Sequence, residues 1–233
     1  MTTPEPGEYC LFVFWESGST VADVAADALR PCLGAIAGLR RAIFHLPQAA
    51  IDPLLREEHV KQAVLQLYFD DRGPMDEALR TSLASCLEAI GRALPALSAC
   101  ETSVQAMRVC CRRSPGGAAS VAPSSVYLAG YEGGAEDHQP WIDEYLRGHV
   151  GLMQQLPGLR HLEVYARLSD SPASLAAQRW MLRNKVVFDD ARVMQAALTS
   201  PIRGSMKAHR AGMPALPGRT EHEPMIAYTL VGA

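Results

Sequence analysis

The sequence predicts an α+β fold in which two successive βαββαβ units form one closed structure. Short apolar runs of strand-like composition alternate with amphipathic segments, and the same order of elements occurs twice. In addition, two groups of residues in the first half recur roughly 120 positions later, which indicates an internal repeat. The 233 residues suffice for one large or two small domains.

The first half contains four predicted strands and two predicted helical segments. The strands are expected at residues 9–15, 39–46, 63–69 and 99–110, where apolar and β-branched residues dominate. An Ala-rich helical segment follows Thr20 and is interrupted by Pro31, and residues 74–94 carry apolar residues at helical spacing between two prolines.

The second half repeats this order. Strands are expected at residues 125–131, 161–168, 181–188 and 224–230, and helices at 140–156 and 190–200. Two split βαβ units of this kind form ferredoxin-like sheets, each covered by helices on one face. The uncovered faces need a partner, so the two antiparallel sheets are expected to pack face to face within the chain, as a barrel-like core.

The repeats are joined by a segment rich in Pro, Gly, Ala and Ser at residues 112–125. We therefore divide the chain into a first repeat, 1–118, and a second repeat, 119–233. The recurring groups include Gly38-Leu39-Arg40 with Gly158-Leu159-Arg160, and Phe69-Asp70-Asp71 with Phe188-Asp189-Asp190. The aspartates follow strands and precede helices, so helix capping is their expected role.

Composition excludes several classes of protein. A formal net charge of -3 argues against a nucleic-acid partner. The first nine residues lack the basic and apolar regions of a signal peptide, and the apolar runs have the length of strands, so we expect a cytoplasmic protein with no membrane partner. The six cysteines form no CxxC pair, and GxGxxG, P-loop, GxSxG and HExxH motifs are absent, so we expect neither a metal nor a cofactor.

The predicted helix 140–156 carries a histidine on its apolar face. At about 100° per residue, Trp141, Tyr145 and His149 fall on the apolar side of this helix. A buried imidazole has two nitrogens to satisfy and a pKa near neutrality, so it is either a hydrogen-bonded core residue or a proton-transfer group in a cavity. The sequence leaves both interpretations of His149 open.

Other polar and aromatic residues are candidates through their spacing from this helix. Tyr145 adds a hydroxyl to the same wall, although such an aromatic stripe is also typical of packing. His161, Glu163 and Tyr165 share one face of their strand and become partners of His149 if that face meets the helix; otherwise Glu163 is solvated. Trp180 either lines the pocket or enters a core strand.

A Pro- and Gly-rich segment, residues 211–220, lies between His209 and His222. It is long for a loop in a compact domain, and it is either a lid over a site or a disordered connection.

An ordered set of motifs in the second repeat resembles the EthD-like members of the dimeric α/β-barrel superfamily. The set consists of His149 in its helix, Leu156-Pro157-Gly158-Leu159-Arg160, the Phe188-Asp189-Asp190 strand end, and Leu198-Thr199-Ser200-Pro201. The resemblance covers roughly residues 125–230 and implies a ferredoxin-like fold with small organic ligands. The first repeat looks like a degenerate copy, because Leu29-Arg30-Pro31-Cys32 stands where the helix histidine is expected.

The resemblance implies a family that includes cofactor-free isomerases, polyketide cyclases, decarboxylases and cofactor-independent monooxygenases, with haem-using branches. We therefore expect a cofactor-free enzyme of lyase or isomerase type that moves protons on a hydrophobic, aromatic-type small molecule. The expected catalytic residues are His149, Tyr145 and Glu163, and the expected substrate-binding residues are Trp141, Tyr165, Trp180 and His161. The alternatives are a monooxygenase and a non-catalytic protein that binds a small molecule or haem. Pairing of two such chains into a homodimer is left open.

Overall fold

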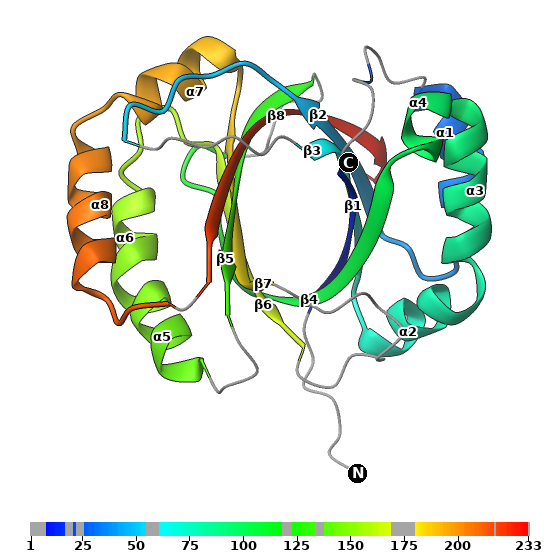
Figure 1. Ribbon diagram of the computed structural model, residues 1–233, viewed down its shortest axis with the longest axis horizontal. Coiled ribbons are helices and arrows are strands. Elements are labelled where there is room, and N and C mark those ends of the chain that lie inside the picture. The colour runs from blue at the N-terminus through cyan, green and yellow to red at the C-terminus, as the bar shows by residue number, and fades with distance from the viewer. Residues whose placement is uncertain are drawn as a thin grey trace.

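Eight antiparallel strands close into one barrel in the computed structural model, which describes residues 8–16, 21, 26–54, 61–117, 123–133, 138–168, 180–216 and 218–232 (Figure 1). The strands are β1 (Tyr9–Glu16), β2 (Arg41–Pro47), β3 (Lys61–Phe69), β4 (Glu101–Arg113), β5 (Ser124–Glu132), β6 (His161–Arg167), β7 (Trp180–Phe188) and β8 (Thr220–Val231). Their order around the barrel is β1-β3-β2-β8-β5-β7-β6-β4.

Two seams join the halves of the chain into this barrel. The strand order is β4-β1-β3-β2 in the first half and β8-β5-β7-β6 in the second. At one seam β2 pairs with β8, so that His45 lies opposite Ala227; at the other β4 pairs with β6, so that Val109 lies opposite Tyr165. Because both seams are hydrogen-bonded, neither half has an unpaired sheet edge.

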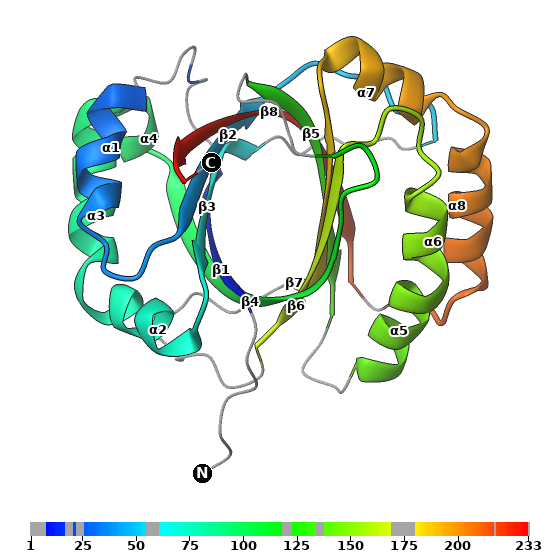
Figure 2. The ribbon, with the colours of Figure 1, turned by 180° about the vertical axis from the view of Figure 1, so that it is seen from behind.

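The helices cover the barrel on two opposite sides, as Figures 1 and 2 show. On one side lie α1 (Ala26–Gly34), α2 (Arg72–Thr81), α3 (Leu83–Ala93) and α4 (Pro95–Ser98). On the other lie α5 (Gln139–Glu144), the π-helical turn η1 (Tyr145–His149), α6 (Val150–Met153), α7 (Ala191–Leu198) and α8 (Ile202–Gly212). None of the helices in the described ranges is long and apolar enough to span a membrane.

Four local features differ from the sequence-based expectation. The helix expected at 74–94 is divided at Ser82 into α2 and α3. An unpredicted helix, α8, follows α7, and β8 begins at Thr220 rather than Pro224. Asp190 caps α7 by accepting a hydrogen bond from the Val193 amide, as expected, whereas Asp71 makes no side-chain cap at α2.

Alternation along the strands separates two outer cores from the interior of the barrel. Odd-numbered residues of β6 and β7, such as Tyr165 and Val187, pack inside the barrel with Phe12 from β1. Even-numbered residues, such as Val164 and Val186, pack outward against the helices of the second half. The sheet therefore separates every side chain under those helices from the barrel interior.

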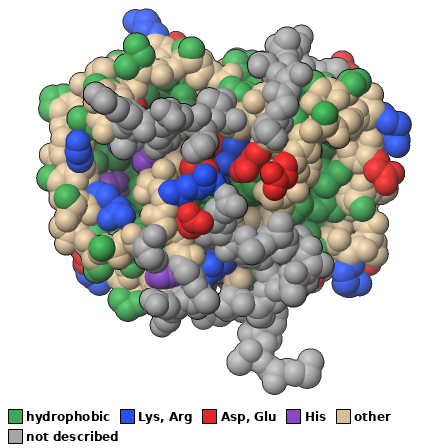
Figure 3. Space-filling view, in the orientation of Figure 1, with side chains coloured by type: hydrophobic (Ala, Val, Ile, Leu, Met, Phe, Trp, Pro, Cys, Tyr) green, Lys and Arg blue, Asp and Glu red, His purple; other side chains and the backbone are tan. Residues whose placement is uncertain are grey.

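The barrel interior contains charged residues as well as apolar ones. At one end the Lys61 ammonium lies 2.8 Å from Glu221 and 3.3 Å from Glu223, and all three side chains are buried. Arg183 lies over the Phe14 ring at 4.3 Å in the same region. Figure 3 shows basic and acidic side chains gathered in the centre of the face that looks down the barrel.

His45 in the barrel interior makes the stability of the protein dependent on pH. Burial, together with the charge of Lys185, lowers the pKa of His45 from 6.5 to about 3. The folded protein therefore keeps this imidazole neutral where the unfolded chain protonates it, and stability is lost as pH falls from 6.5 towards 3. We expect His45→Gln to reduce the loss by up to about 1.4 kcal/mol per pH unit in this window.

The pH dependence of stability must be compared between wild type and His45→Gln, because Glu223 changes stability with pH in the opposite direction. Burial raises the pKa of Glu223 to about 7 even though Lys61 and Arg183 lower it, so this carboxyl adds stability as pH falls. Urea unfolding at several pH values from 5 to 7 measures the pH dependence of stability for wild type and for His45→Gln. Identical pH dependence of the two proteins would contradict the lowered pKa, because His45 would then titrate alike in the folded and unfolded states.

Candidate functional site

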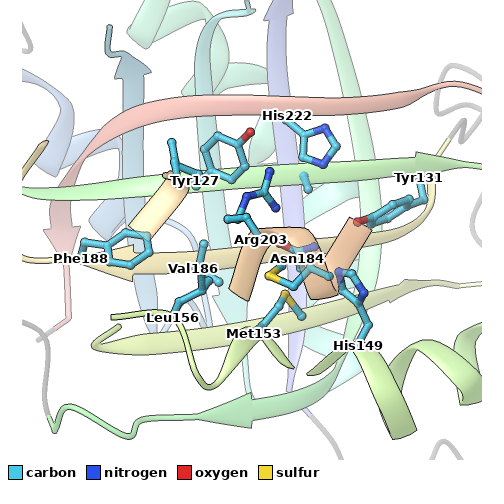
Figure 4. Close-up of a pocket in the computed structure, with 13 residues that line it drawn as sticks. Tyr127, Tyr131, His149, Met153, Leu156, Asn184, Val186, Phe188, Arg203 and His222 are labelled. Atoms are coloured by element: carbon cyan, nitrogen blue, oxygen red, sulfur yellow. The ribbon is translucent and has the colours of Figure 1, made fainter. Parts of the chain in front are cut away.

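Two connected cavities lie between the second-half sheet and its helices. The inner cavity has a volume of about 370 Å³ and the outer one about 630 Å³, each including its open mouth. They share five lining residues: Tyr131, His149, Arg203, Met206 and His222. Figure 4 shows that these side chains converge from β5, β8, η1 and α8.

A π-helical turn positions His149 in this pocket. Within η1 the Val150 amide donates to the Tyr145 carbonyl, five residues earlier, and the ring centroids of Tyr145 and His149 are 4.7 Å apart. Turns of this kind often mark functional positions in helices. Gly148 allows α8 to approach, because a β-carbon at Gly148 would lie 2.0 Å from His209 Nε2.

His149 is buried and neutral. Its side chain is 4% exposed, and its Nδ1 atom has no hydrogen-bond partner in the described part of the protein. Burial is the largest cause of a pKa of about 3 for His149, and electrostatic interaction with nearby basic side chains, among them Arg203 and Arg210, contributes to the same lowering. A neutral imidazole with a free nitrogen can accept or donate a proton to a ligand in the cavity.

A hydrogen-bond chain behind His149 ends at the pocket. Asn184 Nδ2 donates to Tyr145 Oη at 2.6 Å, and Tyr145 Oη lies 3.4 Å from Tyr131 Oη, to which it donates. Burial raises the pKa of both tyrosines, so both hydroxyls stay protonated at neutral pH. Because Tyr131 accepts from Tyr145, its own hydrogen is available to an oxygen atom of a ligand.

A segment from the first half completes the wall around Arg203. Tyr127 Oη donates to Asp52 Oδ2 at 2.6 Å, and Arg203 forms an ion pair with the same carboxylate. The side chain of Gln195 holds the backbone of Ile51 through hydrogen bonds of 2.8 and 2.7 Å. The β2–β3 connection thus reaches across to the second-half pocket, where Leu54 lines the outer cavity.

This contact leads to a prediction for Asp52. Replacing Asp52 with Asn is expected to destabilise the protein by about 2 kcal/mol, because the buried Arg203 loses its counter-charge. Urea denaturation measures the change. Gln195→Ala is the control, because it releases the Ile51 backbone without removing a charge. Equal stability of wild type and Asp52→Asn would mean that this ion pair contributes nothing to the fold.

The sequence-predicted site residues divide between two faces of the sheet. His149 lines the pocket, and Tyr145 and Trp141 lie directly behind it, with their rings stacked at 5.3 Å. His161, Glu163 and Tyr165 point into the barrel, so their face of β6 does not meet the His149 helix as the prediction required. They are therefore not part of this pocket.

Glu163 is neither a partner of His149 nor a solvated residue, because the barrel buries it completely. Its carboxylate lies 2.6 Å from Lys185 Nζ, 2.9 Å from Arg41 and 2.7 Å from Arg112. Tyr68 also donates to it at 2.7 Å. Burial alone would raise the pKa of Glu163, but Lys185 and the other cations lower it well below its ordinary value.

Trp180 also lies outside the pocket, at the start of β7, where its ring contacts Arg183 and Gly130. The loop that precedes it, residues 169–179, lies outside the described residues. In the segment predicted as a lid or a disordered connection, 211–220, residues 211–212 end α8 and Thr220 begins β8, and the described residues between them form neither helix nor strand.

Four residues of the pocket were missed by the sequence reasoning. Tyr131 ends a predicted strand, Asn184 lies between Arg183 and Lys185 in the middle of β7, Arg203 belongs to the unpredicted α8, and His222 had been placed beside a loop. Three consecutive polar residues inside a strand with apolar ends were the available signal for Asn184, since buried polar residues need partners. Among the described residues, no group of three or more His, Cys, Asp or Glu could hold a metal ion.

Comparison with known proteins identifies the fold. No family model matches the chain, and no curated protein matches its sequence. A solved structure described as an anthrone oxidase-like protein superposes with a TM-score of 0.61 at 11% identity, covering 97% of this chain and 94% of its own. A putative monooxygenase from Lactobacillus acidophilus has a TM-score of 0.54 at 10% identity, covering 98% and 99%. A putative monooxygenase from Fusobacterium nucleatum has a TM-score of 0.55 at 8% identity, covering 96% of this chain and 94% of its own. At these identities the likeness concerns architecture, and the chain has the fold of the dimeric α/β-barrel proteins along nearly its whole length.

Proposed function

We propose that the protein is a small-molecule enzyme that transfers a proton to or from a hydrophobic, aromatic-type substrate bound beside His149. The observation that carries the proposal is the buried, neutral imidazole with an unpartnered Nδ1 atom at the junction of two cavities. Positioned proton-transfer groups in water-excluding pockets are typical of acid-base catalysis. Proton transfer of this kind requires no cofactor.

The residues around His149 suggest how the reaction proceeds. His149 removes a proton from an acidic carbon next to a carbonyl group, and the carbonyl oxygen gains negative charge. Tyr131 donates a hydrogen bond to that oxygen, and the charge of Arg203 stabilises it. The apolar residues Met153, Leu156 and Val186 hold the substrate rings. Return of the proton to another carbon gives an isomerase, and loss of a leaving group gives a lyase.

Cofactor-independent oxygenation is the second candidate, and the names of the structural neighbours favour it. The same deprotonation starts this reaction, because a carbanion in an aromatic ketone reacts with O₂. Anthrone would then give anthraquinone and water, with one O₂ consumed for each molecule. Both candidates share the proton transfer at His149 and differ in the fate of the carbanion.

Anthrone tests both candidates, because its central methylene group is acidic. In D₂O without oxygen, wild-type protein should accelerate deuterium exchange at this methylene, measured by NMR. In air, formation of anthraquinone with equal consumption of O₂ would identify the oxygenase. Exchange without quinone would identify a proton-transfer enzyme. If neither reaction exceeds the rate without protein although anthrone binds, the pocket only binds ligands. A Soret band in the purified protein would favour haem binding instead.

We also propose that the chain consists of two ferredoxin-like units, 1–118 and 119–233, and that the second is related to the EthD-like proteins. The 4-1-3-2 type of strand order within each half supports the two units. In the first, α1 contains Pro31 and Cys32 where the second has its histidine-bearing helix. One site for each chain is therefore expected, with the first unit completing the wall of its outer cavity through Leu54.

Separate expression of the halves tests this organisation. Each isolated half would expose two strands that are paired at the seams, together with the apolar barrel face. We expect each to aggregate or to self-associate, and mixing them to restore the barrel. Size-exclusion chromatography with light scattering measures this. Two soluble, monomeric, cooperatively folded halves, with 119–233 fully active, would contradict the intrachain pairing.

A further inference from the structure

The charges around the pocket indicate which class of molecule it binds. Three cationic side chains, Arg203, Lys207 and Arg210, line the two cavities from one face of α8, and no Asp or Glu among the described residues lines either cavity. The chain as a whole carries a formal net charge of -3. A concentration of positive charge in one cavity of an acidic protein favours an anionic ligand through its electrostatic potential.

The three cationic side chains differ in whether a carboxylate neutralises their charge. Arg203 forms an ion pair with Asp52, which is outside both cavities. The Arg210 guanidinium instead lies over the rings of Tyr131 at 5.8 Å and Trp141 at 5.2 Å. Within the described ranges, no carboxylate lies within ion-pairing distance of Arg210 or Lys207. The charge at the outer cavity is therefore available to a ligand.

A buried donor in the pocket also lacks an acceptor. Arg203 is 9% exposed, and its Nε atom has no hydrogen-bond partner among the described residues, although its NH2 atom meets Asp52. Figure 4 shows Arg203 among Tyr127, His222 and Asn184 in the pocket. Burial of an unpaired guanidinium donor is unfavourable unless a ligand supplies the acceptor, and an anionic oxygen is the strongest one.

The inner and outer cavities differ in chemistry. The inner one adds mainly apolar side chains to the shared residues, including Met153, Leu156 and Phe188. The outer one adds Lys207, Arg210 and Thr220. A ligand that fills both therefore has an apolar body and a charged or polar end.

We propose that the substrate is an amphipathic anion, with an apolar ring system in the inner cavity and a single acidic group, a carboxylate or an ionised phenol, held by Arg203 and Arg210. The inference rests on the proposed function in treating the ligand as a substrate. The preference of the pocket for an anionic ligand does not depend on that function. Such a ligand would also offset the positive charges of Arg203 and Arg210, which contribute to the lowered pKa of His149. Binding would thus make His149 a stronger base when the substrate is in place.

Matched ligands test the charge preference independently of catalysis. The probes are 2-naphthoate and its neutral isostere 2-naphthamide, and isothermal titration calorimetry at low salt measures both dissociation constants. We expect 2-naphthoate to bind about 10-fold more tightly, since hydrogen bonds with an ionised partner are roughly twice as strong as neutral ones. The preference should decrease as salt screens the charges.

Single substitutions test which side chain produces the preference for 2-naphthoate over 2-naphthamide. Arg210→Gln should reduce the ratio of the two dissociation constants to near 1, whereas Arg192→Gln should leave it unchanged, because Arg192 is exposed on α7 and lines neither cavity. Equal or tighter binding of 2-naphthamide would overturn the anion proposal and leave the proposed function standing. Failure of both probes to bind at about 1 mM would also overturn it. Normal anion preference without deuterium exchange of anthrone would instead count against the proposed function.

Discussion

Replacing His149 with alanine is expected to lower the rate of enzyme-dependent exchange by about 10²- to 10⁴-fold while the protein stays folded. The imidazole has an unpartnered Nδ1 atom at the junction of the two cavities. Its removal leaves Tyr131 and Arg203 to stabilise negative charge but takes away the proposed base. The measurement is deuterium exchange of anthrone without oxygen, with circular dichroism and a melting curve for each variant.

His209→Ala is the matched control for this prediction. His209 lies on α8 with its ring 5.5 Å from that of His149, yet it lines neither cavity. Its removal tests whether any loss comes from disturbing the contact between η1 and α8. We expect a change of less than about 10-fold, because His209 lines neither cavity and acts on the reaction only through its contact with His149. Full activity in a folded His149→Ala protein would make His149 a core residue.

Replacing Glu163 with alanine is expected to destabilise the protein by about 3–5 kcal/mol. The carboxylate is the shared counter-ion of Lys185, Arg41 and Arg112, and it is fully buried in the barrel. Without it, Lys185 remains as a buried charge without its strongest partner. For a protein of this size the melting temperature should fall by roughly 6–20 °C, since each kcal/mol corresponds to about 2–4 °C.

Asp189→Ala provides the control, because it also removes an acidic residue from an ion pair. Asp189 pairs with Arg160 at the surface, where the two side chains are 39% and 40% exposed. Its loss should change stability by about 0–1 kcal/mol. Differential scanning calorimetry compares the two variants. If Glu163→Ala keeps its stability but loses exchange activity, Glu163 has a catalytic role that the geometry does not account for.

Most of the strands could be predicted from local sequence, because apolar residues facing the barrel or the helices leave a clear pattern. The start of β8 could not. Glu221 and Glu223 belong to this strand and face the barrel, where Lys61, contributed by β3, neutralises them. A sequence pattern reads such charges as exposed, because the compensating residue lies more than a hundred positions away in the chain. The burial of Glu163 escaped prediction because its partners Lys185, Arg41 and Arg112 come from three other strands.

The candidate site likewise contains one residue that the sequence could predict and several that it could not. His149 could be found from the periodicity of one helix. Its partners come from other elements: Tyr131 from β5, Asn184 from β7 and Arg203 from α8. The helix α8 has few apolar residues and two internal or terminal glycines, which weaken the sequence signal for a helix, although its apolar residues lie on one face. Only the folded barrel brings these residues, and Leu54 of the first half, to one pocket.

A crystal structure of the full chain with bound 2-naphthoate tests the account most directly, because it shows where the protein holds an aromatic ligand. We predict electron density for the rings in the inner cavity beside Met153 and Leu156, with the carboxylate at Arg203 and Arg210, and no ligand inside the barrel. Ring density in the barrel interior beside Glu163 and Tyr165, with the His149 pocket unchanged, would contradict the assignment of the site.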